Sequence, residues 1–177
     1  MTQAAFRILP LDGRERSGFV CASDPLTRYF HLHVTQDIRR RIAACYIAVH
    51  GATDTIAGFY TLSAADIPLT DLPADIAKRL PRYPTLPAAR LGRLAVDGRF
   101  TGQKLGATLL VDAILRAAAS EVAVFAMVVD AKDAQAEAFY RHHGFATYAS
   151  ASGRLMAPLS ALLPHTSVSG QVSDPSP

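Results

Sequence analysis

In the first half of the chain the spacing of apolar residues changes several times, and each pattern predicts a helix, a strand or a connector. Residues 25–42 carry Tyr29, His33 and Ile38 on one helical stripe, which predicts a helix. Two β-rich runs, residues 45–49 and 56–62, flank a polar turn with Gly51 and Asp54 and predict a β-hairpin. A short helix is expected around residues 73–80, capped by Thr70 or Asp71. The prolines of "LPRYPTLP" then predict an extended connector.

In the second half of the chain, the periods predict strands and helices in alternation. Residues 89–96, "ARLGRLAV", are typical of a strand, and residues 104–119 have apolar positions at helical spacing. Residues 122–129, "VAVFAMVV", form an unbroken apolar run that predicts a strand covered on both faces. Residues 133–145 predict a helix that ends at Gly144, and "RLMAPL" a last strand. The Ser-, Gly- and Pro-containing residues 165–177 are expected to be a disordered tail behind one domain, residues 1–164.

This order of elements predicts a mixed α/β fold around a central sheet. The strand–loop–helix–strand unit in the middle is expected to be a right-handed crossover. Ligands of such sheets bind beyond the carboxyl ends of the strands. We therefore expect the end of "RLAV", the loop after it and the start of the next helix to border one crevice.

The loop in "VDGRFTGQKLGATLL", residues 96–110, predicts an anion site. A strand that runs through a glycine turn into a helix N-terminus leaves backbone N–H groups free to bind a phosphate. No Gly-Lys-Ser/Thr follows Gly102, and the dinucleotide spacing of glycines is absent, so neither common phosphate loop fits.

Composition and charge narrow the class of protein. Of the 177 residues, 50% are hydrophobic and 19% charged, which is ordinary for a soluble protein with a proper core. No apolar run reaches the ~20 residues of a membrane span, and no signal peptide is evident, so no membrane association is expected. The two cysteines, Cys21 and Cys45, indicate buried thiols in a reducing cytoplasm. His31 and His33 lack a third ligand, so no metal is predicted.

Basic residues cluster beside the glycine loop. Between residues 78 and 104 the only acid is Asp97, and a second cluster lies at residues 39–41. Each residue alone is best explained as part of a solvated face, but together they favour a polyanionic ligand. The basic residues of the first cluster are Lys78, Arg79, Arg82, Arg90, Arg93, Arg99 and Lys104.

The glycine loop followed by "VVDAKDAQAEAFYRHHGF" resembles the GCN5-related N-acetyltransferases (GNAT). The likeness is strongest to the GNAT toxins of bacterial toxin–antitoxin pairs, through "FYTLSA" and "KRLPRYPTLPAARLGRLAVDGRF", and it covers most of residues 15–160. It implies a GNAT fold with helices on both faces of the sheet, acetyl-CoA as cofactor and acetylation of the α-amino group of aminoacyl-tRNA. It also implies a ribbon-helix-helix antitoxin and a homodimer. The superfamily loop reads Gln/Arg-x-x-Gly-x-Gly/Ala, whereas Thr101 and Lys104 stand at its first and fourth positions.

The resemblance assigns Tyr140 as the general acid. An α-amino group has a pKa of about 7.7–8.0 and needs no strong base, but a thiol with a pKa near ~8.5 leaves better beside an acid. The alternative is that Tyr140 is a core aromatic. His142 and His143 have no evident partner, so a general base is the weaker interpretation for them.

The resemblance also assigns the cofactor and tRNA sites. Backbone groups of Leu94, Ala95 and Val96 are expected to hold the thioester and pantetheine, although sheet pairing alone would explain them. For Asp133, a role as helix N-cap fits equally well, and Arg93 could instead be buried and structural. The other cofactor candidates are Arg99, Gly102, Gln103, Lys104, Leu105, Gly106, Ala107 and Phe139, and the tRNA candidates are Arg82, Arg90 and Arg93, with Arg99 a further candidate for tRNA phosphates.

Two other functions remain open on the sequence alone. One is a GNAT enzyme that acetylates a small-molecule amine or a protein N-terminus, which would need an acidic or apolar acceptor pocket. The other is a non-catalytic binding module, which would have no need of a proton donor such as Tyr140.

Overall fold

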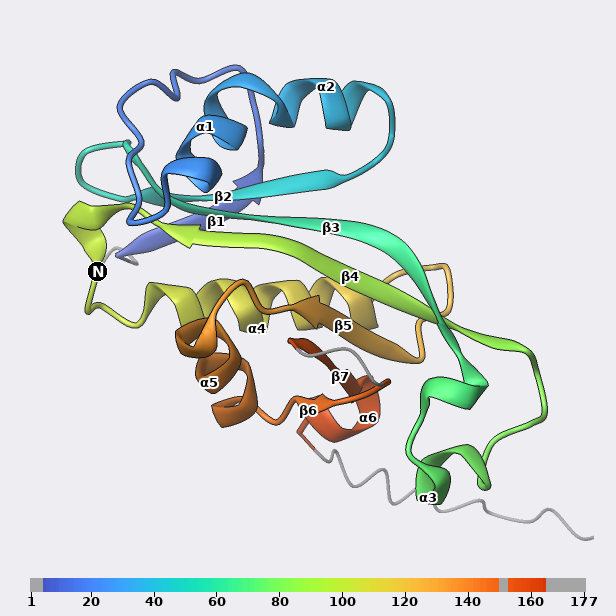
Figure 1. Ribbon diagram of the computed structural model, residues 1–177. Coiled ribbons are helices and arrows are strands. Elements are labelled where there is room, and N and C mark those ends of the chain that lie inside the picture. The colour runs from blue at the N-terminus through green and yellow to red at the C-terminus, as the bar shows by residue number, and fades with distance from the viewer. Residues whose placement is uncertain (1–4, 150–152, 165–177) are drawn as a thin grey trace, which may run out of the picture.

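A seven-stranded mixed sheet forms the centre of the computed structural model, which describes residues 5–149 and 153–164 (Figure 1). The strand order is β1-β2-β3-β4-β5-β7-β6, and only β4 and β5 are paired in parallel. The strands are β1 Phe6–Pro10, β2 Ala44–His50, β3 Ile56–Pro68, β4 Thr85–Val96, β5 Ala126–Asp130, β6 Ala146–Thr147 and β7 Arg154–Pro158.

Helices cover both faces of this sheet (Figure 1). The two helices α1 (Asp24–Leu32) and α2 (Val34–Arg39) lie on one face, and α4 (Leu105–Ala118) and α5 (Ala134–His142) lie on the other. Phe30 and Phe59 stack in the core under α1, whereas Leu109 and Leu110 of α4 are fully buried in the opposite core. The mixed α/β architecture expected from the sequence is therefore confirmed.

The shorter helices lie at the ends of strands. The 3₁₀ turn η1 (Leu69–Asp71) and α3 (Ala74–Ala77) join β3 to β4. A second 3₁₀ turn, η2 (Gly98–Phe100), follows β4, and α6 (Leu159–Leu162) follows β7.

The parallel ladder between β4 and β5 is short, and this positions the site. It runs from Ala88↔Ala126 to Leu91↔Val129, whereas β4 continues to Val96 with only β3 beside it. The two strands therefore separate at their carboxyl ends, which leaves one edge of β4 without a strand partner among the described residues.

Several boundaries differ from the sequence expectations. The helix expected over residues 25–42 is two helices that meet at His33. The strand expected to begin at Val122 begins at Ala126, because Val122 is 75% exposed and only residues 126–129 lie fully inside the sheet. Residues 85–87, expected in the connector, are already part of β4, where Pro87 pairs with Asp66 of a β3 that extends past the predicted end at residue 62.

Other differences concern elements with little periodic signal. The helix expected over residues 73–80 spans only Ala74–Ala77, and Pro73, rather than Thr70 or Asp71, occupies its N-cap. The strand β1 and the short elements β6 and α6 were not predicted. The tail expected at residues 165–177 lies outside the described residues.

None of the helices in the described part of the chain is long and apolar enough to span a membrane.

Candidate active site

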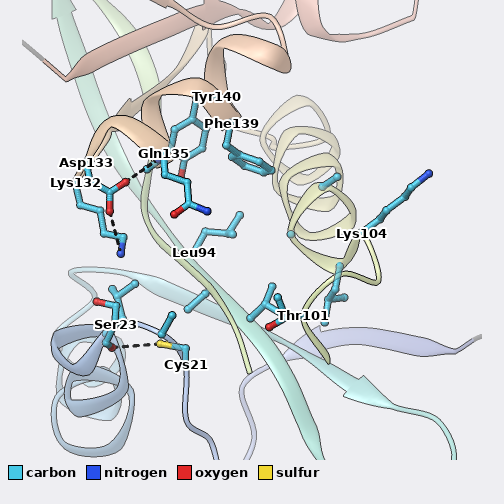
Figure 2. Close-up of a pocket in the computed structure, with 18 of the residues that line it drawn as sticks. Cys21, Ser23, Leu94, Thr101, Lys104, Lys132, Asp133, Gln135, Phe139 and Tyr140 are labelled. Atoms are coloured by element: carbon cyan, nitrogen blue, oxygen red, sulfur yellow. Dashed lines mark hydrogen bonds and ion pairs between the residues drawn. The ribbon is translucent and has the colours of Figure 1, made fainter. Parts of the chain in front are cut away.

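A cavity of about 760 Å³ opens where β4 and β5 separate. Its walls come from both faces of the sheet: the segment before α1 and its first turn, the end of β4, the loop that leads into α4, and α5 with the loop before it (Figure 2). Cys21 and Ser23 lie across the cavity from Lys132 and Asp133 (Figure 2). This volume is in the range of small-molecule and cofactor sites.

The open edge of β4 directs backbone donors toward this cavity. The Asp97 N–H donates to the Ala57 carbonyl of β3, at 2.8 Å. Because backbone groups alternate in direction along a strand, Leu94 and Val96 direct their N–H and C=O groups to the opposite edge. That is the edge from which β5 has separated, so the Leu94 and Val96 N–H groups are available to a ligand.

The N-terminus of α4 supplies further donors. Its N-cap, Lys104, adopts the left-handed conformation (φ 60°) and makes no side-chain cap hydrogen bond. The helical hydrogen bonds begin with Thr108 N, which donates to the Lys104 carbonyl at 3.1 Å. The N–H groups of residues 105–107 therefore have no partner within the helix. The positive end of the helix dipole lies at the same place, which favours a phosphate.

Two glycines shape this loop. Gly102 has φ 81°, a conformation that side chains rarely adopt. Gly106 lies in the first turn of α4, and a Cβ there would approach the Leu94 side chain and the Phe139 ring at 3.9 Å. No protein atom blocks such a Cβ, but it would occupy cavity space, so glycine at this position keeps the cavity open.

Tyr140 reaches the cavity from α5 and points toward Leu94 (Figure 2). The residue is only 8% exposed, and its ring packs edge-on against Phe139 and Phe145. Burial raises the pKa of the Tyr140 phenol to about 12. None of the hydrogen bonds among the described residues involves its hydroxyl, and this hydroxyl is not among their buried atoms without a partner, so it remains accessible from the cavity.

The polar residues at the start and end of α5 have structural partners. The Asp133 carboxylate accepts a hydrogen bond from Ala136 N and pairs with Lys132 at 3.4 Å, so it is the N-cap of the helix. The His143 Nδ1 lies 2.7 Å from the Phe139 carbonyl. Because a carbonyl only accepts, Nδ1 carries a proton, and this bond fixes the orientation of the His143 ring at the cavity wall.

The structure brings most of the cofactor candidates together. Leu94, Ala95, Val96, Gly102 and Lys104 all line the cavity. Leu105, Gly106 and Ala107 continue this wall, and Asp133, Phe139 and Tyr140 line the cavity from α5.

Two cofactor candidates are not part of the cavity lining. Gln103 is exposed in the loop, and Arg99 forms a bidentate pair with the buried Asp97. The sequence reasoning also missed lining residues before and on α1, namely Ala22, Ser23 and Leu26. No local motif marks them, since they reach the site only through tertiary structure.

The arginines expected to bind tRNA differ in exposure and in their partners. Arg82 is exposed in the connector before β4, Arg90 forms an ion pair with Asp130, and Arg93 is half-buried with its guanidinium 3.5 Å from the centre of the Tyr29 ring.

Both cysteines are buried and free. Burial raises the pKa of Cys45 to about 12. The described residues contain no cluster of three or more side chains suited to a metal ion.

Comparison with protein families and curated proteins gives consistent matches. The sequence model of a family described as an acetyltransferase (GNAT) domain matches residues 41–147. A probable toxin TacT of Sinorhizobium fredii is 25% identical over 173 residues, 91% of this chain and 96% of that protein. A tRNA-acetylating toxin of Mycobacterium tuberculosis is 37% identical over 92 residues, 51% of this chain and 54% of that toxin.

Solved structures match nearly the whole chain. A tyrosine-to-phenylalanine mutant of KacT aligns with TM-score 0.81 and 26% identity, covering 89% of this chain and 97% of that one. AtaT complexed with acetyl-methionyl-tRNAfMet aligns with TM-score 0.80 and 26% identity, covering 89% and 96%. AtaTR bound with AcCoA aligns with TM-score 0.76 and 26% identity, covering 90% and 97%.

Proposed function

Because this chain belongs to the GNAT acetyltransferase family, we propose that it transfers an acetyl group from acetyl-CoA to the α-amino group of aminoacyl-tRNA. The protein is an N-acetyltransferase. The observation that carries the proposal is the free edge of β4 opposite Tyr140, which combines carbonyl-binding donors with a proton donor in one cavity. A relative named for tRNA acetylation and a neighbour complexed with acetyl-methionyl-tRNAfMet support the acceptor.

The residues of the cavity fit coenzyme A. The absence of a Cβ at Gly106 leaves room between Leu94 and Phe139, beside the free N–H groups of residues 105–107. In our proposal these N–H groups and Lys104 hold the pyrophosphate, and Leu94–Val96 hold the pantetheine arm. Phe139, on the far wall, packs against that arm, and the Asp133 side chain lies near it while it caps α5.

Arg99 and Gln103 stay outside this assignment. The Arg99 guanidinium contacts Asp97 instead of the cavity, and Gln103 does not line it. We therefore base the cofactor site on the glycines, Lys104 and the α4 backbone.

The chemistry divides between the two walls. Bound acetyl-CoA supplies a thioester whose carbonyl carbon is open to attack by an amine. The Leu94 and Val96 N–H groups polarise the carbonyl oxygen, as fixed donors do in acyl transfer. The Tyr140 hydroxyl, still protonated at neutral pH, donates to the departing sulfur. The acceptor α-amine has a pKa of at most about 8, so a reactive neutral fraction exists without a dedicated base. The proton that this nitrogen loses as the amide forms balances the one that Tyr140 gives to the sulfur, so that coenzyme A leaves as the thiol and the phenol is restored.

A toxin role follows from the same relatives. One relative is named a probable toxin TacT, and related structures include a KacTA–DNA complex and an AtaT–AtaR complex bound to DNA. We propose that this chain is a homodimer that blocks translation in the cytoplasm, where charged tRNA is used, and that a ribbon-helix-helix antitoxin neutralises it. Arg82, Arg90 and Arg93 are our candidates for tRNA phosphates.

The test is acetyl transfer to total tRNA. Purified protein is incubated with labelled acetyl-CoA and with tRNA that is either charged with amino acids or stripped of them. Label on the charged pool alone is expected, and mass spectrometry of the released amino acids then names the preferred acceptor. Label on neither pool, with acetyl-CoA binding intact, would exclude this acceptor and point to a small-molecule amine or a protein N-terminus.

A further inference from the structure

The segment Gly18–Ser23, here called the arm, forms the cavity wall before α1 and is attached to the end of β4 through its backbone. Val20 N donates to the Asp97 carboxylate at 3.1 Å, and Gly98 N donates to the Val20 carbonyl at 2.9 Å. Cys21 forms an isolated antiparallel bridge with Asp97. The Val20 side chain is 57% exposed and contributes little to this attachment. Immediately after it, Cys21, Ala22 and Ser23 line the cavity.

Asp97 is the centre of the attachment and is only 2% exposed. Its Oδ2 accepts from Val20 N and from the Arg99 guanidinium, and its Oδ1 accepts from Arg99 N and Arg99 Nε at 2.9 and 2.8 Å. The bond from Arg99 N caps η2. Arg99 also reaches across to the Gly18 carbonyl at 3.2 Å, so the guanidinium holds the arm at a second point.

One carboxylate therefore connects three walls of the cavity. The strand end with the Leu94 and Val96 donors precedes it, the loop with Thr101, Gly102 and Lys104 follows it, and the arm binds to it from the side. The cofactor loop has independent support from α4, whose Leu105 and Leu109 are buried. The arm depends more strongly on Asp97, because the carboxylate binds Val20 N directly and orients Arg99, which holds the Gly18 carbonyl. Its other attachments are the bond from Gly98 N to the Val20 carbonyl, the buried Phe19 ring, a bond between the Phe19 carbonyl and His31, and the bond from Cys21 N to Thr27.

We propose that Asp97 and Arg99 are positioning residues that hold the arm as the acceptor-side wall, at a fixed distance from the backbone donors of β4. The inference rests on the proposed function, because it takes the arm to face the acceptor. Neither residue lines the cavity, and Arg99 acts on the arm rather than on coenzyme A. Acyl transfer needs the amine about 3–3.5 Å from the carbonyl carbon, so a small shift of this wall affects turnover more than cofactor binding.

The first variant is Asp97→Asn. Both carboxylate oxygens accept two donors each, and an amide has one oxygen, so either orientation of the asparagine places its NH₂ against donors. We expect turnover with saturating charged tRNA to fall roughly 10- to 100-fold, because a ~1 Å displacement costs up to that factor. The Kd for acetyl-CoA, measured by calorimetry, should stay within about threefold of wild type, less than one decade of affinity.

The matched control is Asp112→Asn on α4. Asp112 also accepts from a tyrosine hydroxyl and an arginine, but it lies outside the cavity lining. Its substitution should lower the melting temperature without changing turnover, which separates positioning from general loss of stability. A loss of acetyl-CoA affinity in Asp97→Asn that equals the loss of turnover contradicts the proposal.

Arg99→Ala provides a second, milder test that leaves both backbone bonds of Asp97 in place. We expect turnover to fall several-fold, less than a decade, with unchanged acetyl-CoA affinity. The double variant should be about as impaired as Asp97→Asn alone, because both residues act through one arm. If the losses of turnover multiply in the double variant, the two residues act independently, which contradicts the proposal. Weaker acetyl-CoA binding in Arg99→Ala would assign Arg99 to the cofactor and also overturn it. Failure of the proposed function is distinct, since wild type itself would then leave charged tRNA unlabelled.

Discussion

At the scale of single residues, Tyr140 has the features of a general acid: a buried ring and a hydroxyl that faces the cavity. We expect Tyr140→Phe to bind acetyl-CoA as wild type does, because the ring and its packing remain. Turnover should fall by about 10²–10⁴-fold, the usual contribution of a positioned acid. Calorimetry and single-turnover acetylation measure the two quantities, and intact turnover would remove Tyr140 from the mechanism.

The raised pKa of Tyr140 also affects how turnover depends on pH. Below about 12 the phenol keeps its proton, so the acid remains in its active form across the working range. Turnover should rise as the acceptor amine loses its proton, with a pKa of at most about 8, and should then stay level to pH 10. A decline between pH 8 and 10 in the single-turnover rate would show that the acid titrates earlier than its burial implies.

Gly106→Ala should separate stability from binding. The backbone of Gly106 is helical, so alanine is tolerated and should stabilise the fold by roughly 0.4–1 kcal/mol through its higher helix propensity. The added methyl group would occupy the space between Leu94 and Phe139, so the Kd for acetyl-CoA should rise at least about tenfold, or ~1.4 kcal/mol. Thermal unfolding without ligand and calorimetry test this pair. Unchanged acetyl-CoA affinity in this variant would show that pantetheine does not lie against α4 at Gly106.

The sequence located the part of the site that lies in one continuous stretch. Gly102, Lys104 and Gly106 stand in a strand–loop–helix unit whose geometry follows from local conformation, and their place in the cavity follows from it. The arm could not be located this way, because Val20 meets Asp97 across 77 positions of the chain. Arg99 was expected to contact the cofactor because it lies in the same loop, but its guanidinium binds the buried carboxylate of Asp97, two residues before it.

At the scale of elements, the packing of α4 on β3 and β4 leaves no room at Gly58. A Cβ there would lie 2.9 Å from the Leu109 side chain and 3.0 Å from the Ala95 carbonyl, and a backbone atom cannot rotate away. We expect Gly58→Ala to lower the free energy of unfolding by about 1–3 kcal/mol, as overpacking does. Chemical denaturation measures it. Gly92→Ala is the control, since its Cβ would meet only the Thr61 hydroxyl, at 3.1 Å, and an equal loss in both variants would contradict the close packing of α4.

The boundaries of an element could be predicted from the sequence where its regularly spaced apolar residues are all buried. The buried positions of α4, such as Leu109 and Ala113, matched the helical spacing in the sequence. The run at residues 122–129 misled because hydrophobicity does not report exposure: Val122 is apolar but lies outside the sheet. The strands β3 and β4 are longer than expected because they pair with each other even where their residues have a weak preference for strands, such as Asp66 opposite Pro87.

At the scale of the whole molecule, the basic residues differ in how much charge they can offer to RNA. Among the described residues Arg82 has no ion pair, whereas Arg90 shares Asp130 with Arg154. We expect Arg82→Ala to reduce the salt dependence of tRNA binding by about one unit of log Kd per log salt. Arg90→Ala should reduce it by less, because Asp130 already offsets its charge. Titrations at several salt concentrations test this order, and equal slopes for both variants would contradict it.

The separation of β4 from β5 gives the cavity walls from both faces of the sheet. The arm and α1 border it on one face, and α4 and α5 on the other. With walls on both faces of the sheet, the cavity can hold donor and acceptor at the same time, so we expect the acyl group to pass directly between them. Initial rates measured while both concentrations vary should give intersecting double-reciprocal lines, as in a sequential mechanism. Parallel lines would mean that the first product departs before the second substrate arrives, and an acetylated side chain of the enzyme would then have to be found.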